Sequence, residues 1–441
     1  MIKRFLPAVF LWLAGGALFA QELLTFEKVI QLGLENNFDV NIAINEREIA
    51  ANQKQMGLGA IMPVVDARYS RTASTEDVEQ QFLNDASPRI IEDAKSQNET
   101  FSLVAIYGIS ADALIALKRL GKLTEISELE AKVVVENTVA NLSFAYYRLV
   151  LELQRNRLLR ETLELSQRRL DIARAQYELG QQSKSAYLAA QVDYNADLSL
   201  LVSQEQVIQT AKINLNELLA VPATYNYVVK DTILVEGNLL LEDLIDNSLH
   251  HNKQLLVTQR QENLAFLQIR ELQAQRLPTL TFNGNYNHSV QNSDAGFIIQ
   301  NKRDGYNFGA TIGINLFSGF TLNRRIQTAK LERVNQQYAL EQYEVQLDAD
   351  IHRTFNIYAN SKKRLEIEQN NFNVVEENTE IAFERFKMGL TGFLEFRDAQ
   401  VSRLEAENRL IDAIFSIKET EIELMRLSGK IFYQGNGEPV L

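Results

Sequence analysis

The sequence contains no cysteine and very little proline. With no cysteine among its 441 residues, the chain cannot form a disulfide, a thiolate metal site or a lipid attachment on cysteine. Only six prolines are present, and none lies between Thr279 and Glu438. Because proline interrupts helices, this spacing leaves room for very long ones. Because no disulfide can form, the chain must be stabilised by packing or by assembly alone.

Basic charge and enzyme motifs are also scarce. Apart from Lys3 and Arg4 the chain has a formal net charge of −14, since the whole sequence carries −12. Such an acidic chain is a poor partner for nucleic acid. It has no Gly-rich phosphate loop and no nucleophile elbow, and its four histidines form no spaced metal site. We therefore expect no enzymatic activity, no catalytic residue, no cofactor, no metal and no nucleic-acid partner.

The N-terminus has the pattern of an export signal. Lys3 and Arg4 precede an apolar run over Phe5–Phe19, which is shorter than the ~20 residues that a membrane-spanning helix needs. We expect residues 1–20 to be a signal peptide and the mature chain to begin near Gln21. No later apolar run is long enough for a transmembrane helix.

The remaining chain contains the same pattern twice. Residues 24–70 match residues 239–285 at an offset of 215, which then falls to 211 and to 209. A two-fold duplication indicates one structural half built twice, and the falling offset places length changes in loops. We expect a first repeat over 21–220, a connector over 221–240, a second repeat over 241–429 and a tail over 430–441. Matched positions are Asn37 and Asn252, Pro63 and Pro278, Gly108 and Gly319, and Gly180 and Gly389.

A heptad pattern runs through the longest segment of each repeat. Its members are Leu142, Leu149, Asn156, Leu163, Leu170 and Tyr177, and then Ile351, Tyr358, Leu365, Phe372, Thr379 and Phe386. This period predicts coiled-coil-type packing. We predict helices of roughly 100 Å over Asp112–Leu179 and Thr321–Met388. Shorter helices are expected after each glycine turn, over Ser185–Ala220 and Phe393–Ser428, and before the strands, over Phe26–Ile61 and Leu241–Leu277.

Strands follow Pro63 and Pro278. Alternation is nearly strict over Thr279–Val290 and Tyr306–Phe317 and weaker over Val64–Arg71 and Asn98–Gly108. One face is apolar and the other mostly Asn, Thr, Ser and Gly, which is typical of an outer-membrane β-barrel, although hairpins of a soluble sandwich also alternate. We place Ile312 and Ile314 toward lipid and Thr311 and Asn315 toward water. The polar segments Thr72–Glu99 and Gln291–Asp304 are expected to be loops, the first of them extracellular.

Four strands are too few to close a barrel, since about eight are needed. Open strand edges cannot lie in lipid. The barrel must therefore be shared between copies of the chain, with eight strands from two copies or twelve from three.

The order of these elements resembles the TolC-like outer-membrane efflux proteins over essentially the whole mature chain. Both glycine turns are followed at equal spacing by Ala-Gln-Val. The run from Phe386 to Gln400 is similar to the family's aromatic-x-x-Gly…Asp-x-x-Asp-Ala signature, and Leu316-Phe317-Ser318-Gly319 to its Leu-Phe-x-Gly. The resemblance implies a mainly α chain with transmembrane β structure. It also implies a homotrimer whose α-helical barrel is continuous with a shared 12-stranded β-barrel.

The same resemblance implies a passive exit duct for efflux or type I secretion. It would lie in the outer membrane of a Gram-negative bacterium and project into the periplasm. Its partners would be outer-membrane lipid, a periplasmic adaptor (membrane fusion protein) and an inner-membrane pump of the RND, ABC or MFS type.

Several residues are expected to carry this function. By resemblance, Glu395 and Asp398 ring the periplasmic entrance; alternatively they are ordinary helix acids, with Asp398 paired to Arg397 or Arg403. The predicted adaptor-docking turns contain Tyr177, Gly180, Phe386, Gly389 and Thr391, and the predicted helix–strand junctions contain Pro63, Pro278, Gly108 and Gly319. Where the family has a polar latch, this chain has Phe386, Thr391 and Ala186. Either other contacts hold the tip shut or its closed state is weaker.

The competing interpretation is a periplasmic coiled-coil adaptor or scaffold without a membrane barrel. An adaptor has a single α-hairpin flanked by the halves of a small β-domain. This chain has two hairpins, each with its own strand pair, which favours the exit duct.

Overall fold

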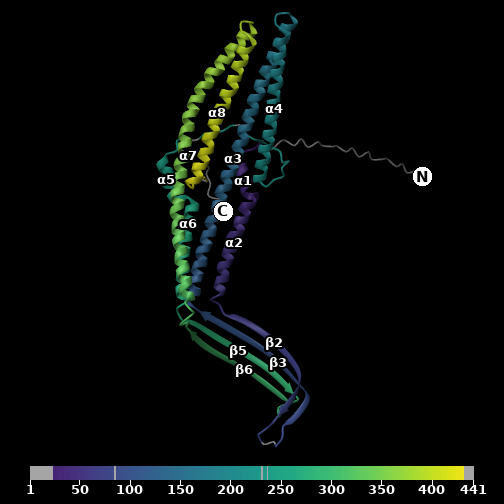
Figure 1. Cartoon of the computed structure of the whole chain (residues 1–441), viewed down its shortest axis with the longest axis vertical. Helices are drawn as coiled ribbons and strands as arrows, with labels where there is room; N and C mark the ends of the chain where they lie inside the picture. Colours follow the sequence, from purple (N-terminus) through teal and green to yellow (C-terminus); the bar gives the residue numbers. More distant parts are fainter. Residues whose placement is uncertain (1–22, 84–85, 230–231, 236, 432–441) are drawn as a thin grey trace, which may run out of the picture. The chain divides into compact units, whose positions relative to one another are not determined.

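The computed structural model describes residues 23–83, 86–229, 232–235 and 237–431 (Figure 1). The predicted signal peptide and nearly all of the predicted tail lie outside these ranges. The described residues form two compact units, and each repeat contributes to both. The hairpin unit contains the residues up to Phe38, Asn137–Leu241 and Arg353–Arg426. The sheet unit contains Asp39–Glu136, Glu242–His352 and the residues from Leu427 onward.

The sheet unit is built around four antiparallel strands in the order β2-β3-β5-β6 (Figure 1). They are β2 (Val64–Gln80), β3 (Arg89–Ile109), β5 (Thr279–Ser293) and β6 (Gln300–Gly313). The two repeats thus supply one hairpin each, and β3 pairs with β5 across the repeat boundary. The strand pairs predicted from alternation are confirmed, and the sheet has two open edges, β2 and β6.

The predicted loops were wrong in extent. Most of Thr72–Glu99 and of Gln291–Asp304 is strand, and 81–88 and 294–299 alone are the connections. Both faces of these extensions are mostly polar, so the alternation that reveals a half-buried strand is missing, while ladder hydrogen bonds still satisfy the backbone. Strand β6 also stops at Gly313. Ile314 and Asn315 therefore lie beyond the strand, and only Ile312 and Thr311 keep the faces assigned to them.

The four long helices match their predicted ranges to within about two residues. They are α3 (Ala111–Glu178), α4 (Lys184–Leu218), α7 (Thr321–Lys387) and α8 (Phe393–Leu427). In the second heptad series Ile351, Tyr358, Thr379 and Phe386 are buried, and in the first series Leu142 and Leu149 are fully buried. None of the helices in the described part of the chain is both long and apolar enough to cross a membrane.

The helices predicted over Phe26–Ile61 and Leu241–Leu277 are each broken in two. The observed elements are α1 (Phe26–Asn36) and α2 (Phe38–Gly59), and α5 (Leu241–His251) and α6 (Lys253–Ala274). The breaks fall on the matched residues Asn37 and Asn252, whose ψ angles of 130° and 113° are not helical. Asn252 caps α6 by accepting a hydrogen bond from Leu255 N at 2.8 Å, and asparagine favours this position over a helix interior.

Each asparagine also binds the end of a later helix. Asn37 Nδ2 donates to Leu218 O at 3.0 Å, and Asn252 Nδ2 donates to Leu427 O at 3.0 Å. Leu218 and Leu427 are themselves matched positions at the 209 offset. Each break therefore satisfies a C-terminal helix carbonyl that would otherwise lack a partner.

The core of the hairpin unit packs α1, α3 and α4 around the short parallel pair β1 (Leu23–Leu24) and β4 (Val228–Val229). β4 lies within the predicted connector. Gly33 lets α1 approach α3 closely, because a Cβ there would come within 2.2 Å of Leu142 Cδ1. In the sheet unit α6 packs against α7 through Ile269 and Ile326, and the Arg119–Glu271 ion pair at 2.7 Å joins α3 to α6.

Candidate functional site at the glycine turns

The two glycine turns have the same backbone geometry. Gly180 ends the turn after α3 and Gly389 the turn after α7, each with φ of +73°. Gln181 N donates to Gln176 O at 2.8 Å, and Leu390 N donates to Arg385 O at 2.9 Å, which is the αL cap expected for glycine. No atom outside the chain neighbours lies within 4 Å of a Cβ built at either glycine. Both turns are therefore open to a partner.

An aromatic pair closes each hairpin behind its turn. Tyr177 stacks on Tyr187 with ring centroids 5.9 Å apart, and Phe386 stacks on Phe396 at 5.5 Å. The pairs are matched at the 209 offset, but their surroundings differ. Phe386 is 3% exposed because Leu165 and Ile172 pack against it, whereas Tyr177 is 38% exposed. Phe386 thus supports its turn from inside, and Tyr177 belongs to a surface.

The two acids expected at the entrance are both exposed on α8, but only one is paired. Glu395 Oε1 accepts from Arg385 Nη1 at 3.1 Å, so α7 and α8 are joined beside the turn. Within the described residues Asp398 makes no ion pair and no hydrogen bond through its side chain. The alternative pairing of Asp398 with Arg397 or Arg403 is absent there, because Arg397 binds Asp197 and Arg403 lies among Glu161, Glu376 and Glu407.

A network of buried polar side chains ties three helices together above the turns. We call it the clasp; it consists of Ser166 and Arg169 on α3, Asp193 and Asp197 on α4, and Arg397 and Gln400 on α8. Arg397 binds Asp197 through two nitrogens at 3.1 and 3.2 Å, and Arg169 Nη2 donates to Asp193 Oδ2 at 2.9 Å. The clasp therefore joins the hairpin of the second repeat to that of the first.

Gln400 and Ser166 complete the clasp from the α3 side. Gln400 accepts from Arg169 Nη1 at 3.1 Å and donates to Ser166 Oγ at 2.8 Å, and Ser166 donates to Asp197. Arg169 is 0% exposed and Asp197 is 2% exposed. Burial lowers the pKa of Arg169, and the neighbouring Asp193 acts in the opposite direction. Charges held this far from water need such partners.

Comparison with known proteins shows what the chain resembles. Residues 244–430 match the model of the outer membrane efflux protein family. The "Proteases secretion protein PrtF" of Dickeya chrysanthemi is 22% identical over 382 residues, which cover 85% of this chain and 81% of that protein. The second repeat is therefore similar to the outer membrane efflux protein family.

Solved structures show the same fold. The outer membrane protein VceC of Vibrio cholerae matches with a TM-score of 0.76 at 16% identity, over 92% of this chain and 96% of its own. The CmeC outer membrane channel of Campylobacter jejuni matches with a TM-score of 0.79 at 15% identity, over 92% of this chain and 86% of its own. The predicted fold class is confirmed at the level of the whole protomer.

The clasp lies close to the expected latch positions but uses none of them. Phe386 is buried in the aromatic pair, and Thr391 Oγ1 has no hydrogen-bond partner within the described residues. Arg397 follows Glu395 by only two residues, yet it points to α4 instead of the turn. Two basic residues lie beside the second turn, and Arg385 pairs with Glu395 while Lys387 pairs with Glu384. Neither joins the two hairpins.

The clasp was missed because no motif marks it. Its six residues are spread over three helices, and their side chains meet only after the hairpins pack. One signal was present: the positions matched to Arg169, Asp193, Asp197 and Arg397 are Asn378, Ser402, Ala406 and Leu188. Charge that is present in one repeat and absent in the other indicates a contact that the duplication does not repeat.

The prolines of the predicted helix–strand junctions lie where a strand begins. Pro63 and Pro278 each stand directly before a strand, β2 and β5. The glycines differ, although they are matched in sequence. Gly108 lies inside β3, opposite Thr281, whereas Gly319 lies beyond the end of β6 in a left-handed turn with φ of +61° that leads into α7. β3 runs on almost to α3, and β6 does not reach α7.

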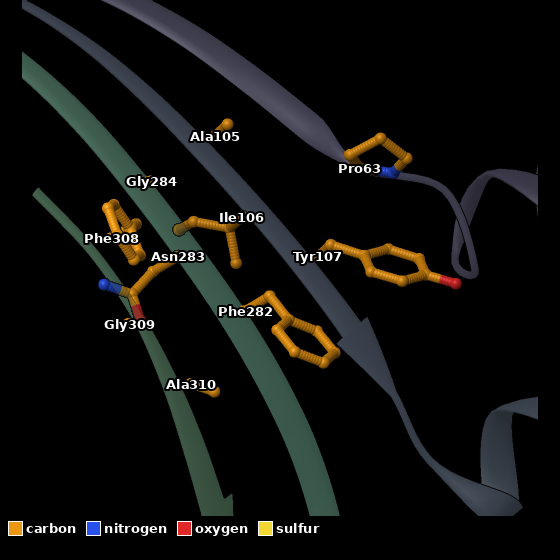
Figure 2. Close-up of a pocket in the computed structure, with 10 residues that line it drawn as sticks. All are labelled: Pro63, Ala105, Ile106, Tyr107, Phe282, Asn283, Gly284, Phe308, Gly309 and Ala310. Carbon is orange, nitrogen blue, oxygen red and sulfur yellow. The ribbon is translucent and has the colours of Figure 1, made fainter.

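A hollow of about 570 Å³ lies on the sheet near Pro63 (Figure 2). Figure 2 shows the rings of Tyr107 and Phe282 side by side at one end of it, with Phe308 across the hollow. Gly284 and Ala105 lie between these rings, and their lack of bulk leaves the hollow open. Asn283 and the hydroxyl of Tyr107 are the polar side-chain groups among the lining residues, and no group of three or more possible metal ligands exists in the described part of the chain. The hollow is therefore a notch in an apolar surface and not a chemical site.

Proposed function

We propose that this protein is the exit duct of a tripartite efflux or type I secretion system. It resides in the outer membrane of a Gram-negative bacterium and projects into the periplasm. Substrate passes through it passively, and partner proteins open it at the glycine turns. The observation that carries the proposal is the combination of two matched hairpin turns with a four-stranded sheet that has open edges. The similarity to PrtF, a proteases secretion protein, supports protein secretion as one of the two uses.

The sheet supports insertion in the membrane through one apolar face. Paired residues in the four strands alternate together, so the same face contains Val65, Ala67, Tyr69, Phe101, Leu103, Ala105, Tyr107, Phe282, Tyr286, Tyr306, Phe308 and Ile312. Many of these side chains are exposed in the single chain, although the chain is otherwise rich in charge. An exposed apolar face bounded by aromatic residues fits lipid.

The helices support a ring of identical copies. Within the chain, Leu165 and Ile172 of α3 pack against the aromatic pair of the second hairpin, and Leu158 packs against Ile411 of α8. The residues matched to these three on α7 are Ile367, Val374 and Ile381, and all three are exposed. The exposed Tyr177–Tyr187 pair is matched in sequence to the Phe386–Phe396 pair, which α3 covers.

The exposed α7 residues Ile367, Val374 and Ile381 of one copy therefore fit the α3–α4 hairpin of the next copy. Within the chain, α3 packs against the α7–α8 hairpin in the same way. Such a head-to-tail contact closes into a ring. Three copies give the twelve strands of a closed barrel. We propose a homotrimer that binds a periplasmic adaptor at the tip and, through it, an inner-membrane pump of the RND, ABC or MFS class.

Export after substitution of Gly389 tests this function. Leu at Gly389 adds bulk where a partner helix must approach, so export should be lost while trimers still insert. The matched control is Gly237→Leu, because Gly237 also has a positive φ, of +62°, and open space around its Cβ but lies in the connector. Normal export with Gly389→Leu would remove the turn from the mechanism. Chemical cross-linking in detergent should stop at three chains, and a product limited to two would contradict the trimer.

A further inference from the structure

The strands of the sheet continue well past its apolar face. On the apolar face, at the end away from the helices, the first row with charge contains His288 and Asp304. The next row on that face contains Arg71, Glu99 and Lys302. β3 extends ten more residues beyond Glu99, to Arg89. These extensions are mostly polar on both faces, with Val78, Ile90 and Ile91 as the larger apolar exceptions, so they lie outside lipid on the far side of the membrane from the helices.

Apolar residues return at the tip of this polar extension. The loop between β5 and β6 contains Phe297, Ile298 and Ile299, which are 79%, 63% and 78% exposed. Three consecutive exposed apolar residues at a loop tip are unfavourable in water unless something covers them. Lipid does not reach this height on the sheet, because the charged rows lie between the loop and the apolar face.

The loop has a defined position. Asp294 N donates to Lys95 O at 2.9 Å, and Ser293 N donates to Ile299 O at 3.0 Å. The ring of Phe297 lies 4.5 Å from that of Phe82, just beyond β2. The loop therefore leans across β3 and is held there by backbone bonds and an aromatic contact.

One buried residue indicates the side on which the loop lies. Ala94, the neighbour of Lys95, is 5% exposed. In the ladder Ala94 is paired with Glu76 and alternates with Lys95, so it belongs to the face that also contains Ser102 and Thr100. That is the face opposite the apolar one. The sheet is thus covered on its water-facing side at the height of the loop.

We propose that the β5–β6 loops of three copies meet over the outer mouth of the shared barrel and form an apolar cap. The inference rests on the proposed trimer, because the contact between loops continues the contact between strands. Twelve strands spaced ~4.8 Å apart and tilted ~40° enclose a ring roughly 24 Å across. A six-residue loop reaches roughly 10 Å, so three loops with large side chains span the radius. The apolar loop tip of each chain is then covered by the loop tips of the other two chains.

Cross-linking through introduced cysteines tests the cap directly, since the chain has no cysteine of its own. Under mild oxidation of intact cells, Phe297→Cys and Ile298→Cys should give disulfide-linked dimers. The control is Gln97→Cys, which lies at similar height on the face that turns outward, and it should give none. Trimers that form normally but show no cross-link at Phe297 or Ile298 would overturn the cap. Absence of trimers would instead overturn the proposed assembly.

Permeability gives the second test. The variant Phe297→Asn, Ile298→Asn, Ile299→Asn should remove the apolar contact and leave the strands and the periplasmic turns unchanged. We expect a higher single-channel conductance and faster uptake of large antibiotics from outside, with export retained. Unchanged conductance and uptake in a variant that still forms trimers would contradict a closed mouth. Quenching of a label at Ile298 by a lipid-soluble agent would show that the loop enters lipid, which also overturns the cap.

Discussion

At the scale of single residues, the clasp places charge where water cannot reach it. Arg169 and Asp197 are almost completely buried, and each has a partner of opposite charge. Breaking a buried pair costs more than the pair itself contributes, because the remaining charge loses its compensation. The clasp therefore stabilises one specific arrangement of α3, α4 and α8 and penalises arrangements that separate them.

Removal of Asp197 should show this penalty. Asp197→Asn leaves Arg397 without its two-nitrogen partner and should destabilise the hairpin unit by about 3 kcal/mol. Replacing both partners, as Asp197→Leu with Arg397→Met, should recover most of the loss because neither partner is left as a buried charge without the other. Thermal unfolding of the trimer in detergent measures both. Equal destabilisation in the single and double variants would mean that packing, and not charge, is what the pair contributes.

Glu407 should make stability depend on pH. Burial raises the pKa of Glu407, and Arg403 acts against this while Glu161 and Glu376 add to it. A carboxyl whose folded pKa is raised contributes stability below its ordinary value of 4.5, and that contribution is lost as pH rises through the folded pKa. Glu407→Gln should therefore raise the melting temperature at pH 8, and the gain should vanish near pH 4. Glu405→Gln, at an exposed position on the same helix, should show no such trend; a pH-independent gain at Glu407 would contradict the assignment.

At the scale of elements, the sequence predicted the helices and strands that follow a repeating pattern. It missed the breaks that single residues make in them. The heptads set α3 and α7, and the αL glycines fixed their ends. Asn37 and Asn252 were visible as matched residues, yet their role depends on carbonyls of Leu218 and Leu427 nearly two hundred residues away. The strand extensions were missed because period-2 alternation needs one buried face. The clasp needs three helices in register, which no local pattern contains.

The apolar face of the sheet leads to a graded prediction. Phe308 is paired with Gly284 near the middle of this face, and Ile312 is paired with Leu280 at its end toward the helices. Arg at Phe308 should cost about 2–4 kcal/mol of folding free energy, and Arg at Ile312 about 0–1 kcal/mol, because the penalty depends on depth in the bilayer. Asn307→Arg, one residue from Phe308 on the water-facing side, is the control. Refolding into lipid vesicles measures all three, and equal effects at Phe308 and Asn307 would mean that the sheet is not in a membrane.

At the scale of the whole molecule, the duplication gives two kinds of contact between hairpins. Within the chain, α8 meets α3 and α4 through apolar residues and the clasp. Between copies, the matched positions hold Leu188, Asn378, Ser402 and Ala406, so these positions of the proposed contact are uncharged and lack the ion pairs of the clasp. A ring with alternating strong and weak contacts opens first at the weak ones. We therefore expect the two hairpins of one chain to move together when an adaptor opens the duct.

The entrance acids connect this assembly to ion selection. In a trimer Asp398 would place three unpaired carboxylates around the tip, whereas each Glu395 is already paired with Arg385. Converging acids attract cations and bind multivalent ones strongly. The channel in a lipid bilayer should therefore prefer cations and be blocked by hexammine cations from the periplasmic side. Asp398→Asn should abolish most of the block, Glu395→Gln should weaken it less, and Arg385→Gln should strengthen it because Glu395 is released. Block that survives in the Glu395→Ala, Asp398→Ala double variant would show that these acids are ordinary solvated helix residues and that the entrance lies elsewhere.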